Sequence, residues 1–329
     1  RRTQIIQLGE GEKASDMYTM TDVMPVENYW IEVSENGLLS RTEGDKPNRL
    51  GGDGAPWSMI RTNTHQTVFL VTTEGKAAAI SSYSVPVQKA EEEGVPASKV
   101  APLHKNDILQ GIFAVPINGE ADKERYVVTV TRQGMIKRSA VGDLPGASAS
   151  TFTLVKVNEN DELFEVLLTR GDQDLLLVTA AGMSIRFNEN EVRSMGLVAA
   201  GVNAIKLKPG DYVVGAAAID DRDEVALLTQ KGLAKRAAGS EYPLQGRYGQ
   251  GVIAWKLDKD DQVSAALVGK LTDRGICHFR KSASKVFTIT NAISRKRASN
   301  GQMMFTLKAS DEVIGFTNLD DYVQFWEKA

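Results

Sequence analysis

The feature that most constrains this chain is a repeat with a period of 50 residues. An aliphatic residue is followed four places later by aspartate in four copies, which are Val157/Asp161, Leu207/Asp211, Leu257/Asp261 and Leu307/Asp311. An earlier pair, Leu103/Asp107, extends the pattern toward the N-terminus. A period near 50 is too long for leucine-rich or helical-hairpin repeats, and it fits one small β-sheet per unit, as in a propeller blade. The sequence therefore predicts an all-β repeat protein.

A second signal in the same unit is an apolar run that ends in Thr-x-x-Gly. The runs are rich in Val, Ile, Leu and Tyr and are bounded by glycine and polar residues, which predicts strand, turn, strand. Each glycine would supply the positive φ that a tight hairpin turn needs. The copies are 68–75, 126–134, 175–182, 225–232 and 29–37, the last with Ser34 in place of the threonine.

A basic residue recurs four positions after the turn glycine. Because side chains alternate faces along a strand, a fixed offset from the turn places equivalent residues on the same side of every blade. In a ring of blades these basic residues would form a positive stripe, which we predict to bind phosphate. The alternative is that they are ordinary solvated charges at strand ends. The position holds Arg41, Ala79, Arg138, Arg186 and Arg236, and Lys137 and Lys235 precede two of the arginines.

The third part of the unit is Gly-x4-Gly-Val-x3-Lys-Leu, found at 196–207 and again at 246–257. Glycines before a buried strand suggest a loop that bends sharply or lets another backbone approach closely. Arg193 and Arg247 flank or occupy these loops, so they are further candidates for a phosphate contact. The aspartates that follow each loop recur in every unit, and we expect them to bond turn amides and not to act in catalysis.

Composition limits the class of protein. The chain has 329 residues, 42% of them hydrophobic, and a net charge of −3, which fits a soluble globular protein with ample core. We expect no membrane association, because no apolar run approaches the roughly 20 residues of a span. A lone Cys277 and three scattered histidines predict no disulfide, metal site or cofactor, and cytoplasmic residence is the default.

Positive charge is concentrated late in the chain. The segment 274–308 has eight basic residues and no acidic one, whereas acidic residues gather elsewhere. A surface segregated in this way can bind phosphate backbones through counterion release without an overall basic protein. We take three basic residues near the sixth predicted turn as candidate DNA contacts: Arg280, Lys281 and Lys285.

Motifs for catalysis are missing from the sequence. It contains no Gly-x-x-x-x-Gly-Lys-Ser/Thr phosphate loop, no His-Glu-x-x-His and no Gly-x-Ser-x-Gly elbow. The sequence therefore predicts a binding domain with no catalytic residues of its own.

Taken in order, these elements resemble the C-terminal domain of the bacterial DNA gyrase A protein. Residues 1–5 look like the exit from the coiled-coil arm of that family, and Tyr29 to Arg41 looks like the opening hairpin of its first blade. Asn63-Thr64-His65 and the following Thr67 to Gly75 resemble the start of its second blade. The resemblance covers nearly the whole chain.

The resemblance implies a six-bladed β-pinwheel, a propeller-like disc in which neighbouring blades exchange strands. It implies a linker at 1–26 and a pinwheel at 27–329, which would be a monomer when isolated. The domain would bind duplex DNA along its rim, bend it and direct strand passage by a gyrase A core, whose cleavage tyrosine lies outside this chain, and a gyrase B partner. The units would centre on Gly37, Gly75, Gly134, Gly182, Gly232 and a region near Ala283, with Phe287 at the arginine offset; an alignment on Gly275 and Thr272 competes for the sixth.

One segment departs from the family pattern. Gyrase A proteins carry a glycine-rich basic box, Gln-Arg/Lys-Arg-Gly-Gly-Arg/Lys-Gly, that is associated with DNA wrapping. Two of its basic positions are replaced here by Leu50 and Asp53, and the resemblance implies weaker DNA contact at this point. The matching segment is Asn48, Arg49, Leu50, Gly51, Gly52, Asp53 and Gly54.

Two alternatives remain open. The domain could resemble the C-terminal domain of the topoisomerase IV protein that corresponds to gyrase A, which selects DNA crossings without wrapping and has a degenerate box. It could also be a propeller that serves as a protein-interaction scaffold without DNA binding, which the acidic pI of about 5.8 fits. The repeated arginines and the acid-free segment 274–308 argue against the scaffold.

Overall fold

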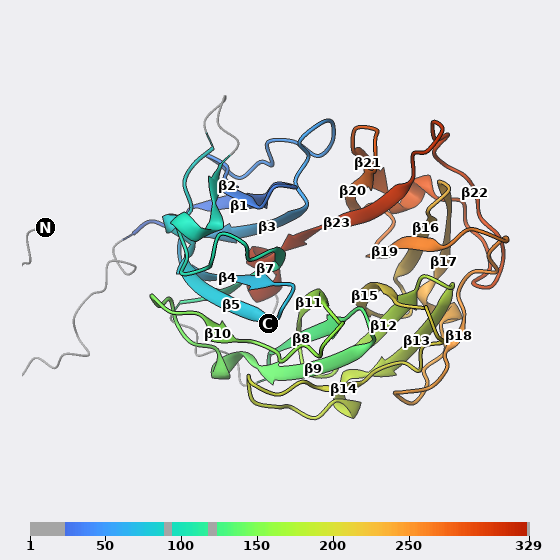
Figure 1. The fold of residues 1–329 in the computed structure, drawn as a ribbon, viewed down its shortest axis with the longest axis horizontal. Helices are drawn as coiled ribbons and strands as arrows, with labels where there is room; N and C mark the ends of the chain where they lie inside the picture. Colours follow the sequence, from blue (N-terminus) through green and yellow to red (C-terminus); the bar gives the residue numbers. More distant parts are fainter. Residues whose placement is uncertain (1–23, 89–93, 118–123, 328–329) are drawn as a thin grey trace, which may run out of the picture.

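The computed structural model describes residues 24–88, 94–117 and 124–327, and in these ranges six small antiparallel sheets form blades around a central axis (Figure 1). Four blades are separate four-stranded sheets, and the first and sixth are joined into one seven-stranded sheet. The one α-helix in the described ranges is α1 (Tyr322–Glu327). The predictions of an all-β fold and of a six-bladed pinwheel are confirmed.

Each of the first five blades takes its outermost strand from the following unit. Neighbouring blades contact one another through their innermost strands, which surround the axis. From the axis outward the strands are β3 (Ser58–Asn63), β1 (Asn28–Val33), β2 (Leu38–Arg41) and β6 (Val95–Pro96); β7 (Leu109–Pro116), β4 (Gln66–Thr72), β5 (Lys76–Ser81) and β10 (Phe152–Thr153); β11 (Leu163–Thr169), β8 (Tyr126–Thr131), β9 (Met135–Ala140) and β14 (Val202–Asn203); β15 (Val213–Ile219), β12 (Asp174–Thr179), β13 (Met183–Asn188) and β18 (Val252–Ile253); β19 (Val263–Gly269), β16 (Glu224–Thr229), β17 (Leu233–Ala238) and β22 (Gln302–Met303); and β23 (Val313–Asp321), β20 (Arg274–Phe279) and β21 (Lys285–Thr288).

The repeated Thr-x-x-Gly motif forms the hairpin turn of the blade. In the fourth blade the amide of Gly182 donates to the carbonyl of Thr179 at 2.9 Å, and Gly182 has a φ of +75°. A Cβ at Gly182 would lie 2.6 Å from the carbonyl oxygen of Trp255, where the exchanged segment crosses the turn. Glycine is therefore required twice, for the left-handed backbone and for the close approach.

The repeated aspartate holds the same turn from the other side. Asp211 accepts hydrogen bonds from the amide of Ala181 at 2.9 Å and from the hydroxyl of Thr179 at 2.7 Å. Asp161, Asp261 and Asp311 accept from the corresponding turn amides of three other blades. The expectation that these carboxylates bond turn amides is confirmed.

Apolar side chains pack between consecutive blades. Buried clusters join the first three blades, then the third to the fourth, the fourth to the fifth and the fifth to the sixth. The strands read as continuous apolar runs, such as Leu175–Val178 in β12, because both faces of each blade are covered. A short 3-10 turn follows the hairpins of the second to sixth units, and another follows β6. They are Ser82–Ser84, Val141–Asp143, Glu189–Glu191, Gly239–Glu241 and Ile289–Asn291, with Ala97–Lys99 after β6.

The register of the sixth hairpin differs from the predicted one by a residue. Ile276 pairs with Val286, as Ala226 pairs with Arg236 in the fifth blade. The arginine offset is thus occupied by Val286 and not by Phe287, and Ser282 rather than Ala283 takes the place of the turn glycine. The competing alignment is also wrong, because Gly275 lies inside β20.

The ring closes between the sixth and first blades through polar contacts and one strand pairing. The end of β23 runs parallel to β3, with Asp320 opposite Ile60, and Figure 1 shows it crossing toward that strand. Arg61 of β3 pairs with Asp321 at 3.1 Å and with Asp45 at 2.6 Å. Helix α1 then packs on the core of the first three blades through Tyr322.

The predicted linker lies largely outside the described residues, which begin at Met24. The carbonyl oxygens of Met24 and Pro25 bond His65 and Thr64 in the turn before β4. In the described ranges, no helix has the length and apolar character needed to cross a membrane.

Candidate nucleic-acid interface

The arginines four residues after the turn glycine tie each blade to the next. Arg186 lies on β13 and is 8% exposed. One of its guanidinium nitrogens, Nη1, donates to the carbonyls of Gly239 and Tyr242 at 3.2 and 3.3 Å, both in the unit of the fifth blade. The guanidinium also pairs with Asp221 at 2.7 Å and with Asp174 at 2.8 Å. Arg186 is therefore an interblade link with nearly all of its donors engaged.

The other three arginines make the same kind of link. The positive stripe predicted from the sequence is wrong for Arg138 and Arg186, which are buried, and Arg41 and Arg236 are half-buried. The physical reason is that the outer hairpin strand faces the neighbouring blade at this offset, where backbone carbonyls need donors. Arg41 Nε donates to the carbonyl of Val85 at 2.9 Å, Arg138 Nη1 to the side chain of Asn190 at 3.0 Å, and Arg236 Nε to the carbonyl of Ala292 at 3.1 Å.

Two predicted contact lysines lie in the interior. Lys137 and Lys235 are each 1% exposed. The ammonium of Lys235 donates to the carbonyls of Ala254 and Ser299, both at 2.8 Å, and Lys137 donates to the carbonyl of Leu197 at 2.8 Å. Burial lowers the pKa of both ammonium groups to about 8. They stabilise the loops that run into the exchanged strands and present no charge to solvent, so the prediction that they face a phosphate is wrong.

The degenerate box lies at the seam of the ring, which is the junction between the sixth and first blades. The amide of Gly52 donates to the carbonyl of Ser284 at 2.8 Å, so the box takes the place of an exchanged outer strand beside the sixth hairpin. Arg49 is exposed and donates to the carbonyl of Asp53 at 2.8 Å, whereas Leu50 is half-buried. The Asn48 side chain bonds that of Gln88, and a Cβ at Gly54 would lie 3.0 Å from the Arg49 guanidinium. Gly51 packs beside the backbone of Ser284 to Val286.

Besides Arg49, four predicted contact residues are exposed on loops or strand ends: Arg193, Arg280, Lys281 and Lys285. Arg280 forms an ion pair with Glu312. Arg247 is half-buried, and its guanidinium donates to the backbone carbonyls of Glu191 and Asn203. The guanidinium of Arg247 therefore anchors its loop to the preceding blade, and these bonds take up donors that a phosphate contact would need.

A row of exposed lysines was missed by the sequence reasoning. Lys156, Lys206 and Lys256 stand 50 residues apart on the segments that lead inward from β10, β14 and β18, the outermost strands (Figure 1). Among the described residues none of the three forms an ion pair. The signal was present in the sequence, because the Lys of Gly-Val-x3-Lys-Leu repeats at the blade period. Arg295 and Lys296 are also exposed, on the loop before β22.

The repeat units match a known family. Residues 66–116, 125–170, 173–220 and 223–270 each match the model described as DNA gyrase C-terminal domain, beta-propeller. These segments are the units of the second to fifth blades. The chain belongs to the DNA gyrase C-terminal domain family. This gyrase-family domain is 32% identical to the DNA gyrase A protein of Staphylococcus epidermidis and 30% identical to that of Staphylococcus aureus, in each case over 77% of this chain. It spans 29% of the length of those proteins.

Solved structures have the same fold as this gyrase-family domain. The C-terminal domain of DNA topoisomerase IV matches with a TM-score of 0.76 and 24% identity, covering 89% of this chain and 94% of that one. A DNA gyrase A C-terminal domain matches with a TM-score of 0.70 and 18% identity, covering 89% of this chain and all of that one. At these identities the likeness establishes the pinwheel fold alone.

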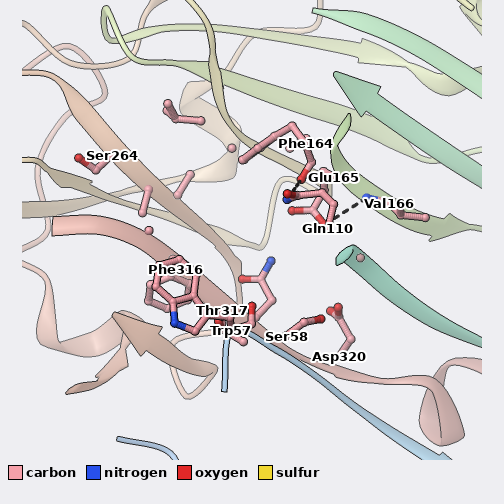
Figure 2. Close-up of a pocket in the computed structure, with 18 of the residues that line it drawn as sticks. Trp57, Ser58, Gln110, Phe164, Glu165, Val166, Ser264, Phe316, Thr317 and Asp320 are labelled. Atoms are coloured by element: carbon pink, nitrogen blue, oxygen red, sulfur yellow. Dashed lines mark hydrogen bonds between the residues drawn. The ribbon is translucent and has the colours of Figure 1, made fainter. Parts of the chain in front are cut away.

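A cavity of about 190 Å³ lies on the axis of the gyrase-family domain and is lined by the innermost strand of every blade (Figure 2). Burial raises the pKa of Glu165 to about 8, and the nearby charge of Asp320 adds to the shift. Burial also raises the pKa of Asp320 to about 6. In the described ranges no cluster of three or more His, Cys, Asp or Glu residues could hold a metal.

Proposed function

We propose that this domain binds duplex DNA along its outer rim, bends it without reading its sequence, and in the whole protein directs strand passage and negative supercoiling by a gyrase A core with its gyrase B partner. Cytoplasmic residence is part of this proposal. The support is the family, together with an exposed set of cations on the rim.

The observation that carries the proposal is the row formed by Lys156, Lys206 and Lys256. The three side chains are exposed, lack acidic partners among the described residues, and follow the outermost strands of three successive blades, the second to the fourth. In this proposal a curved duplex follows that edge. Each lysine that neutralises a phosphate releases a counterion and adds about −0.9 to the slope of log affinity against log salt. Contacts of this kind fix the path of DNA and carry no sequence information.

Bending is the energetic requirement. Smooth bending of a 20–30 bp site by 40–90° costs on the order of 1–6 kcal/mol, so a single contact is insufficient and contacts must be spread around the rim. Arg193, Arg295 and Lys296 extend the lysine row over the third to fifth blades. Lys285 and Arg49 continue it to the sixth blade and the seam.

The test is a ligation assay on nicked circular plasmid at low salt, followed by protein removal and separation of the topoisomers. Wrapping with positive writhe predicts a linking-number shift that grows with protein concentration. Retarded migration of DNA without a linking-number change would restrict the function to binding. The absence of any DNA binding would contradict the proposal and favour a protein scaffold.

A second candidate, selection of DNA crossings without wrapping, is favoured by the box. Asp53 is exposed beside Arg49, where it repels phosphate, and Leu50 supplies no charge. A variant carrying Leu50→Arg and Asp53→Lys should increase the linking-number shift if DNA passes the seam. An unchanged shift would mean that the DNA path does not include the box.

A further inference from the structure

Tyr248 adopts a backbone conformation that is costly for its side chain. Four non-glycine residues in the described ranges have a left-handed φ, and Tyr248, at +64°, is the one aromatic among them. The other three are Asn160, Asp260 and Ser310, each of which directly precedes the repeated aspartate of its unit, where the unit of Asp211 has Gly210. Short polar residues and glycine tolerate this region, whereas a bulky side chain is strained there.

The side chain of Tyr248 reaches solvent. The side chain is 50% exposed, and within the described part of the chain its hydroxyl has no hydrogen-bond partner. The backbone alone holds the loop: the amide of Tyr248 donates to the carbonyl of Ala204 at 2.7 Å, and that of Lys206 donates to the carbonyl of Gly249 at 2.9 Å. Glycine at 248 could make the same backbone bonds without strain. A strained residue whose side chain is half exposed and whose hydroxyl bonds nothing in the described ranges points to a role outside the fold.

The loop that carries Tyr248 lies on the rim. It precedes β18, the outermost strand of the fourth blade, and the amide of Gln245 within it bonds the carbonyl of Arg186 on β13 at 2.8 Å. The bond between Lys206 and Gly249 places the loop directly beside the exposed lysine row. The amide of Arg247 also bonds the Glu191 carboxylate, two residues before exposed Arg193. The loop that carries Tyr248 therefore lies close to Lys206 and Arg193, two exposed cations that form no ion pair within the described ranges.

We propose that Tyr248 contacts the sugar–phosphate backbone of bound DNA, its hydroxyl donating to a phosphate oxygen and its ring packing against a deoxyribose. This inference rests on the proposed DNA-binding function. Tyrosine hydroxyls are among the groups that bond phosphate oxygens in protein–DNA interfaces, and such contacts are independent of base sequence. Because the side chain is neutral, it adds affinity without displacing a counterion, unlike its neighbour Lys206.

The experiment compares four variants of the intact chain on a mixed-sequence duplex over a range of salt concentrations. Tyr248→Gly should lower duplex affinity about three- to tenfold at every salt concentration, with the salt slope unchanged. It should also raise the melting temperature by about 1–2 °C, because glycine relieves the strain. Tyr248→Phe should give an intermediate loss of affinity, since the ring remains.

Two controls make the result specific. Ser310→Gly relieves a left-handed φ at a site away from the loop and changes no charge, so it should raise the melting temperature similarly and leave affinity as in the wild type. Lys206→Gln should reduce the magnitude of the salt slope by about 0.9.

The outcomes separate this inference from the proposed function. If the wild type binds duplex and Tyr248→Gly binds equally well, the Tyr248 contact is wrong while the proposed function stands. If the salt slope of Tyr248→Gly changes by about one, a cation has been displaced, and the neutral contact is wrong. If the melting temperature of Tyr248→Gly falls, the ring stabilises the fold, and the premise that its role lies outside the fold is wrong. If the wild type fails to bind duplex at low salt, both proposals fall.

Discussion

Replacing Arg186 with glutamine should weaken the fold and leave phosphate binding nearly unchanged. This prediction separates the interblade role seen in the structure from the rim role suggested by the sequence. Glutamine keeps a polar side chain of moderate length, but it removes the charge and the forked donors that join Asp174 to the carbonyls of Gly239 and Tyr242.

The expected loss follows from how buried each contact is. Asp221 is 71% exposed, so its pair with Arg186 contributes about 0–1 kcal/mol. The Asp174 side chain is 18% exposed, and loss of its partner leaves a partly buried charge and unpaired carbonyls; breaking such a pair typically costs about 3–5 kcal/mol. At about 2.1 cal/mol/K per residue, the unfolding entropy of this chain is about 0.7 kcal/mol/K, so the melting temperature should fall by about 4–7 °C.

The assay combines thermal melting with duplex binding over a salt series, and Arg193→Gln is the matched control because Arg193 is exposed. The Arg186 variant should melt early and keep its salt slope, whereas the control should melt as the wild type does. Wild-type melting together with a slope reduced by about 0.9 in the Arg186 variant would refute the interblade role and return this arginine to the DNA interface.

Three further outcomes are expected. The pKa of Glu165 is raised to about 8, so between about pH 4.5 and 8 the folded state holds a proton that the unfolded state releases. The free energy of unfolding should therefore fall as the pH rises through this range. Glu165→Gln should reduce that fall by on the order of 2–4 kcal/mol, as measured by denaturant melts across the range. The pKa values of Lys137 and Lys235 are both lowered to about 8, so stability should instead rise between about pH 8 and 10.5. Lys235→Met should make this rise smaller in the same melts and leave the part that Lys137 contributes. Asp211→Ala should lower the free energy of unfolding by about 1–3 kcal/mol, because the turn donors of Thr179 and Ala181 lose their acceptor. The control Asp258→Ala, at an exposed position, should change it by less than about 0.5 kcal/mol. Equal losses in the two variants would contradict the turn role of Asp211.

The fold was predictable because each local signal repeats with the same period. The Thr-x-x-Gly turn closes on itself within four residues, as in the bond from the Gly182 amide to the Thr179 carbonyl, so a short stretch of sequence determines it. Asp211 bonds that turn from 30 residues further along the chain, and its spacing is predictable because it repeats with every unit. The sixth hairpin was displaced by one residue because its turn lacks the glycine that marks the other turns, so only the pairing of β20 with β21 defines its register. A residue repeated in every blade usually serves the blade, and this holds for the arginines as much as for the aspartates.

The sequence by itself determined the number and kind of units, since period, turn chemistry and apolar runs are local properties of the chain. Only the tertiary structure decided which basic residues reach solvent. Arg186 and Lys206 look alike in a repeat pattern, yet one directs its donors to the next blade and the other is exposed at the rim. The difference arises because blade packing and strand exchange bring together segments about 50 residues apart, and burial there depends on which polar groups each neighbouring blade leaves unpaired.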